Sequence, residues 1–155
     1  MSQPYKKLFT YWFSVIIYDL TVEFCAFYIK SWKLKEQMIG AARSGKQNIV
    51  EGSDNMSTSL KVAINLTGIA KGSIEELIGD LEDCIRQNKL NQWKKTDIRV
   101  QEFRSKSAKL VKDLSHLRNL SNVRYLSIFE ENNTLESLAN LLLTLCHQAT
   151  YLLFK

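Results

Sequence analysis

The sequence predicts an all-α protein: a left-handed, antiparallel four-helix bundle with up-down-up-down connections and an extra amphipathic arm before the last helix. Apolar residues recur at steps of three and four along most of the chain, the spacing that places them on one helix face. The chain also has one proline and six glycines, too few for a fold of short strands and tight turns. Its 155 residues are expected to form one domain, 1–155.

The periodic stretches predict helices at about residues 4–30, 32–52, 59–87 and 134–155, with the arm at about 99–117. The first helix carries two neighbouring apolar stripes, which indicates burial on two sides. In a chain of this length, the second stripe predicts contact with another subunit. That stripe consists of Phe9, Phe13, Ile16, Leu20, Phe24 and Phe27.

Two further features are typical of tightly packed helices. Gly68, Gly72 and Gly79 interrupt the third helix, where each costs about 1 kcal/mol relative to alanine, and close helix packing would explain them. The last helix is apolar nearly all round, so we expect it inside the bundle or an oligomer. Asn133 is its expected N-cap, and Glu136 completes a capping box.

The segment from Gln37 to Ser53, QMIGAARSGKQNIVEGS, combines small and polar residues more densely than a surface loop requires. Small side chains allow two helix backbones to approach closely. Polar side chains inside such a contact need partners, because an unpaired buried polar group costs about 1–3 kcal/mol. We therefore predict a polar network in which Glu51 and Glu76 are buried and paired. Its members are Arg43, Asn48, Glu51, Ser73 and Glu76.

This segment, followed by KVAINLTGIAKGSIEELIGDLED, resembles the bacterial four-helix-bundle family first met as proteins encoded in intervening sequences of large-subunit ribosomal RNA. Together with the distal ESLANLLLTLCHQATYLL, it resembles the branch described as having a "four helix bundle suffix". The accessory proteins of diversity-generating retroelements are similar, and they are basic pentamers that bind a reverse transcriptase and nucleic acid. The resemblance therefore implies a homopentamer whose partners are RNA or DNA and a protein such as a reverse transcriptase.

Gly40 to Lys46 matches the first seven positions of a phosphate-binding P-loop. The eighth position is Gln47, which has no hydroxyl for a magnesium ion, and the preceding residues follow a helical pattern instead of a strand. We therefore interpret the glycines as helix-packing residues. An enzyme that binds a nucleotide through Lys46 remains an alternative.

Other chemistry lacks its usual pattern. The acidic group of the third helix suggests a carboxylate metal site, but neither His116 nor His147 follows a glutamate by three residues, as bundle metal sites require. We interpret His147 as a hydrogen-bonded interior or interface residue. Nothing marks a nucleophile, so we expect no enzymatic activity, catalytic residue, cofactor or metal. The acidic residues are Glu75, Glu76, Asp80, Glu82 and Asp83.

Positive charge is concentrated in one segment. Lys94 to Arg118 contains eight basic residues against three acidic ones, so its net charge of +5 equals that of the whole chain. Such a surface can hold a phosphate backbone without reading bases, or it can be only a solvated helix face. The basic residues are Lys94, Lys95, Arg99, Arg104, Lys106, Lys109, Lys112 and Arg118.

Three cysteines, Cys25, Cys84 and Cys146, lie at apolar positions of different helices, as is typical of reduced core thiols in a cytoplasmic protein. Two lysines followed by an apolar stretch near the N-terminus imitate a secretion signal. Asp19 interrupts that stretch, which is also too short to span a membrane. We expect a cytoplasmic protein with no membrane partner.

These observations favour a non-enzymatic, homo-oligomeric scaffold that binds RNA or DNA backbone through the basic arm. The alternative is a protein–protein adaptor or structural oligomer with no nucleic-acid role. Salt-dependent binding to nucleic acid would favour the first, because phosphate contacts release counterions.

Overall fold

The computed structural model describes residues 9–117 and 134–153. These residues form five helices and no strand, which confirms the all-α prediction for this part of the chain. The expected start of the first helix, the end of the last one, Asn133 and Arg118 lie outside the described residues. The helices are α1 (Phe9–Tyr28), α2 (Trp32–Asp54), α3 (Leu60–Gln87), α4 (Ile98–Leu117) and α5 (Leu135–Leu153).

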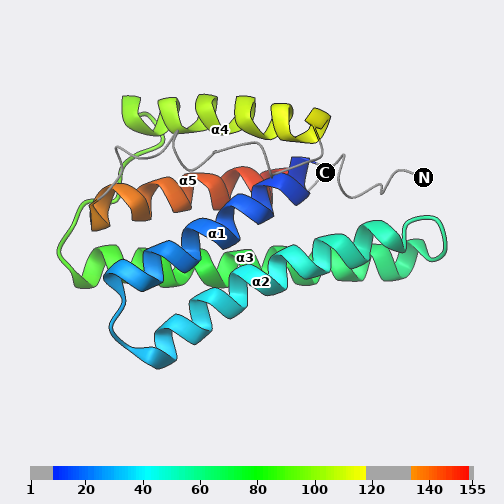
Figure 1. The fold of residues 1–155 in the computed structure, drawn as a ribbon, viewed down its shortest axis with the longest axis horizontal. Helices are drawn as coiled ribbons and strands as arrows, with labels where there is room; N and C mark the ends of the chain where they lie inside the picture. The colour runs from blue at the N-terminus through cyan, green and yellow to red at the C-terminus, as the bar shows by residue number, and fades with distance from the viewer. Residues whose placement is uncertain (1–8, 118–133, 154–155) are drawn as a thin grey trace.

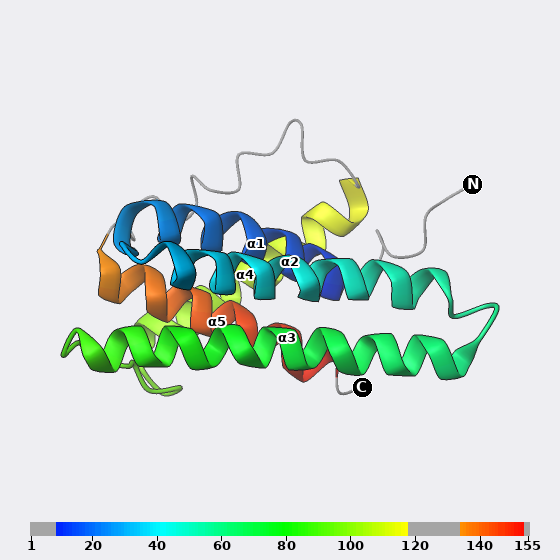
Figure 2. The ribbon, with the colours of Figure 1, turned by 90° about the horizontal axis from the view of Figure 1, so that it is seen from below.

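Four of the helices form a closed ring of neighbours. α1 packs against α2 and α5, and α3 packs against the same two helices (Figure 1). α4 lies outside this group, against α5 and α1. Figure 2 shows α2 and α3 side by side, extending beyond the start of α1. The arrangement is compatible with a helical bundle to which α4 is added.

Three helices, α1, α3 and α4, pack against α5. Every residue from 138 to 146 is buried, which follows from the apolar residues on all sides of this helix. Within the described ranges, neither α5 nor any other helix combines the length and apolar character needed to cross a membrane.

The start of α5 differs from the expected capping box. Thr134 caps the helix, since its hydroxyl accepts a hydrogen bond from the Ser137 amide at 3.1 Å. Glu136 does not turn back to the cap. Its carboxylate accepts hydrogen bonds from two N–H groups in the α3–α4 connection instead, the Asn91 amide and the Trp93 indole.

Most of the second apolar stripe of α1 is covered by the chain itself. Phe13, Ile16, Leu20 and Phe24 are buried, because α1 packs against α2, α5 and α4. Phe27 is 75% exposed and lies near the end of the helix. The inference that this stripe requires another subunit is therefore wrong for its buried members. The largest group of exposed apolar side chains in the described ranges lies on α3 and in the turn before it, at Met56, Leu60, Val62, Ile64 and Ile69.

A glycine of α2, and not those of α3, marks a close approach between these two helices. A Cβ added at Gly45 would lie 3.0 Å from Cγ1 of Ile74. A Cβ added at any of three α3 glycines would meet no atom of the described residues within 4 Å, apart from the local backbone. Within this chain, the prediction that close packing explains these glycines is wrong. They are Gly68, Gly72 and Gly79.

The predicted polar network is present only in part. Asn48 Nδ2 donates to the Ser44 carbonyl at 2.8 Å, and the Ser44 and Ser73 hydroxyls lie 2.9 Å apart. The other predicted members are exposed: Arg43, Glu51 and Glu76. The prediction that the two glutamates are buried is wrong, because consecutive residues of a helix point about 100° apart. Each glutamate directly precedes a buried residue that faces the contact, so the side chain of the glutamate itself points away from the contact.

Candidate nucleic-acid interface

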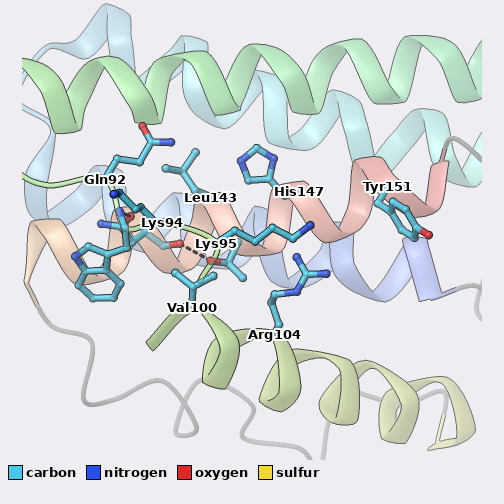
Figure 3. A pocket seen from close by; sticks show the side chains of 11 residues that line it. Gln92, Lys94, Lys95, Val100, Arg104, Leu143, His147 and Tyr151 are labelled. Atoms are coloured by element: carbon cyan, nitrogen blue, oxygen red, sulfur yellow. Dashed lines mark hydrogen bonds between the residues drawn. The ribbon is translucent and has the colours of Figure 1, made fainter. Parts of the chain in front are cut away.

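A groove of about 760 Å³ lies between the α3–α4 connection, the first half of α4 and the outer face of α5 (Figure 3). Lys94 and Lys95 come from the connection, Arg104 from α4, and His147 and Tyr151 from α5. Among the described residues that line it, three are always cationic at neutral pH and none is acidic. We call this feature the cationic groove.

A buried amide fixes the connection against α5. Asn140 is 2% exposed, and its Oδ1 accepts a hydrogen bond from the Trp93 amide at 2.8 Å. Its Nδ2 donates to the Asn91 carbonyl at 3.0 Å and to the Glu136 carbonyl at 2.8 Å. Because both ends of the amide are satisfied, this contact holds the residues just before Lys94 in place.

Glu136 reinforces the same attachment. Its carboxylate accepts from the Asn91 amide at 2.9 Å and from the Trp93 indole N–H at 3.1 Å. These hydrogen bonds lower the pKa of Glu136, because they favour its ionised form. The carboxylate of Glu136 is thus hydrogen-bonded to the connection, and Glu136 is not among the described residues that line the groove.

Arg99 is occupied within the fold. Its guanidinium lies 3.6 Å from the centroid of the Trp93 ring, and its Nη2 lies 2.8 Å from Oδ2 of Asp97. Hydrogen bonds from Arg99 lower the pKa of Asp97. The Trp93 ring also stacks on Phe103, with centroids 5.9 Å apart. Of the seven predicted basic residues within the described ranges, Arg99 is therefore the one whose charge is offset by a carboxylate contact.

The structure divides the other predicted basic residues into two groups. Lys94, Lys95 and Arg104 line the cationic groove. The remaining described ones are exposed on α4, outside it, and Glu102 and Asp113 are exposed on the same helix. The described residues of the predicted basic arm therefore do not all line the groove. The residues outside the groove are Lys106, Lys109 and Lys112.

His147 is exposed in this chain, so the interior placement that the sequence suggested is wrong, and its placement at an interface stays a prediction. Figure 3 shows Lys95, Arg104 and His147 turned toward the same part of the groove. Partial desolvation of the imidazole lowers the pKa of His147; Glu82 opposes this lowering and Arg104 adds to it. The ring is therefore mainly neutral at neutral pH.

Sequence reasoning missed the wall of the groove that α5 provides. Asn140, inside an apolar helix, was a usable signal, because a buried amide requires partners. Tyr151 carried no such signal. Its place in the groove depends on the packing of α4 and the α3–α4 connection against α5, which no local pattern reports.

Other candidate chemistry is not assembled. Gly40 to Lys46 lies inside α2, so its backbone amides belong to a helix and do not form a phosphate-binding loop. Burial raises the pKa of Cys25 to about 11 and raises that of Cys84 and Cys146, so these thiols are protonated. In the described part of the chain, no three His, Cys, Asp or Glu residues are placed to hold a metal ion.

Comparison of the chain with models of protein families, with curated proteins and with solved structures gives no match.

Proposed function

We propose that this protein is a non-enzymatic scaffold that binds the phosphate backbone of RNA or DNA through the cationic groove. One observation carries the proposal. Lys94 and Lys95 from one segment and Arg104 from another converge on a groove whose described lining residues include no carboxylate.

Like charges that are held together favour an anion between them. Lys94 and Lys95 follow a connection fixed by Asn140, and Arg104 belongs to a helix packed on α5. The three residues therefore line the same groove although their charges repel one another. A phosphate among them relieves this repulsion and accepts charge-assisted hydrogen bonds. Contacts of this kind recognise the backbone and do not read the bases.

The exposed lysines of α4 have a secondary role in this proposal. Lys106, Lys109 and Lys112 extend the positive surface, and Glu102 and Asp113 partly offset them. We assign them to long-range attraction of a polyanion, which is sensitive to salt, and place the close contacts in the groove.

The state of the hydroxyl of Thr144 and of the imidazole of His147, which both line the groove, favours binding over catalysis. The Thr144 hydroxyl donates to the Asn140 carbonyl at 2.8 Å, so its proton is already engaged. His147 lines the same groove, and its pKa shift is explained by desolvation and nearby charges without a hydrogen-bonded nucleophile. We therefore assign the groove no reaction and no cofactor.

The proposal is tested by measuring the affinity for labelled RNA and DNA as a function of salt. Replacing Lys94, Lys95 and Arg104 by glutamine should weaken binding about 10- to 100-fold at low salt. The slope of log K against log salt should fall by about 2, at about 0.7 per lost single-strand phosphate contact. The matched control replaces Lys30, Lys33 and Lys61, all exposed and remote from the groove, by glutamine. Equal loss in both triple variants would contradict the groove assignment.

A protein–protein adaptor is the second candidate. The exposed apolar side chains at the start of α3 favour it, because grouped exposed apolar residues are typical of interaction sites. Capture of a partner that survives nuclease treatment, together with no binding to nucleic acid at low salt, would support the adaptor over the nucleic-acid scaffold.

We also propose that the chain assembles with itself and belongs to the four-helix-bundle family that its sequence resembles. Homopentamer formation and a protein partner such as a reverse transcriptase follow from that resemblance alone. The short connections α1–α2 and α2–α3 favour an antiparallel, up-down-up-down, left-handed bundle of α1, α2, α3 and α5, with α4 as the extra arm.

A further inference from the structure

The cationic groove combines charge with apolar side chains and one exposed aromatic ring. Leu143 and Val100 line it beside the basic residues, and Tyr151 lies one helical turn beyond His147. We propose that the groove takes one nucleotide of a single strand, with the phosphate at Lys95 and Arg104 and the base against the Tyr151 ring. This inference rests on the proposed function and adds the form of nucleic acid that is bound.

The phosphate end is defined by side chains and not by helix ends. Lys95 reaches into the groove from the connection and Arg104 from α4 (Figure 3). The amide of Arg99 in the first turn of α4 donates to Asp97, which occupies that end of the helix. The start of α5 is likewise capped, by the Thr134 hydroxyl. The convergent Lys95 and Arg104 side chains are therefore the natural anion ligands in this groove.

The base end is defined by Tyr151. Tyr151 comes four positions after His147, so both side chains lie on the same face of α5. Their positions are about 6 Å apart along the helix axis. Tyr151 is 62% exposed, which leaves aromatic surface accessible. Trp93 is the other aromatic residue of the lining, but Arg99 lies 3.6 Å from its ring centroid and its indole N–H donates to Glu136. The Trp93 ring is thus already engaged in contacts within the protein.

The size of the groove favours a single strand. Its volume of about 760 Å³ falls within the range of about 300–1,000 Å³ for sites that enclose a small organic ligand. One nucleotide fits such a space, whereas a duplex does not enter it. A duplex also keeps its bases stacked inside, so that only its phosphates reach the rim. Single strands offer unstacked bases, and aromatic side chains bind these without strong sequence preference.

The test compares three ligands with the same number of phosphates: a single-stranded RNA, a duplex of half its length, and a strand of the same length that lacks its bases. The intact protein should bind the single strand about tenfold or more tightly than the other two. Tyr151→Leu should lower single-strand affinity about 5- to 150-fold, whereas Tyr151→Phe, which keeps the ring, should stay near the original value. Tyr151→Leu should bind the strand without bases as tightly as the original protein does, because removing the ring and removing the base abolish the same contact.

The outcomes separate this inference from the function on which it rests. If none of the ligands binds, or the Lys94, Lys95 and Arg104 glutamine variant binds as tightly as the original protein, the proposed function fails. If binding depends on those three residues but is equal for the duplex or for the strand without bases, only the nucleotide assignment fails. Thermal unfolding of both Tyr151 variants provides the control for folding, since the side chain is mostly exposed.

Discussion

Asn140 has 2% of its surface exposed, and its side chain makes three hydrogen bonds that join α5 to itself and to the α3–α4 connection. It lies in the wall of the groove and holds the segment that carries Lys94 and Lys95. Asn140 therefore affects a ligand by positioning Lys94 and Lys95. This effect should be separable from the effect of the lysine charges themselves.

Asn140→Ala should lower the free energy of unfolding by about 2 kcal/mol or more, because it leaves the Trp93 amide and the Asn91 carbonyl without their partner. Urea denaturation measures this. The control is Asn48→Ala, since Asn48 is half-buried and hydrogen-bonds within its own helix. We expect about 0.5–1 kcal/mol there. Equal effects of the two substitutions would contradict the role of Asn140.

His147 should make polyanion binding depend on pH. Desolvation and the Arg104 charge lower its pKa against the opposing effect of Glu82, so the free ring is mainly neutral near pH 7. A bound phosphate favours the protonated ring, so binding takes up a proton and affinity should rise as the pH falls from about 7.5 to 6. In His147→Gln, the affinity measured across this pH range should no longer rise as the pH falls. Identical profiles for the two proteins would exclude His147 as its source.

At the scale of elements, the contact between α2 and α3 depends on which residues face the partner helix. Gly45 is buried against Ile74, whereas Gly68 faces open space in this chain. Apolar periodicity predicted both helices, because it reports which face of each is buried. It could not report whether a glycine of α3 faces α2 or solvent, because the interhelical geometry decides this.

Gly45→Val should destabilise the protein by about 1–3 kcal/mol, because the added atoms collide with the Ile74 side chain in a packed contact. Gly68→Ala should stabilise the single chain by up to about 1 kcal/mol, because alanine is the better helix former and meets no described atom within 4 Å. Urea unfolding of the two variants measures both effects. Destabilisation by Gly68→Ala would indicate that Gly68 packs against something outside the described chain.

For the whole molecule, the exposed apolar residues bear on assembly. Ile64 is 62% exposed, and Leu60 lies four residues before it, on the same side of α3. Burying these side chains between copies would favour association, at about 25 cal/mol for each Å² of apolar surface removed from water.

Ile64→Lys should therefore shift the protein toward monomer in sedimentation velocity measurements. Ile98→Lys is the matched control, because Ile98 is 65% exposed but lies at the start of α4. An original protein that sediments as a monomer at every concentration would contradict self-association itself. An equal shift in both variants would contradict the assignment to α3.

The parts of the molecule that could be predicted from the sequence are those encoded locally. Helical periodicity predicted the all-α fold, and charge composition drew attention to Lys94, Lys95 and Arg104. The remainder depends on contacts between distant segments. Asn140 meets Trp93, 47 residues earlier in the chain, and Glu136 meets Asn91, 45 residues earlier. Neither contact changes the periodicity from which the helices were predicted.

The burial of one indole and the exposure of another have an optical consequence. Trp93 lines the groove, whereas Trp12 is 2% exposed in the core and Trp32 is 72% exposed at the start of α2. Replacing Trp12 and Trp32 by phenylalanine would leave Trp93 as the single tryptophan, which can be excited selectively over the tyrosines. Its emission would then report occupancy directly, without a dye attached to either molecule.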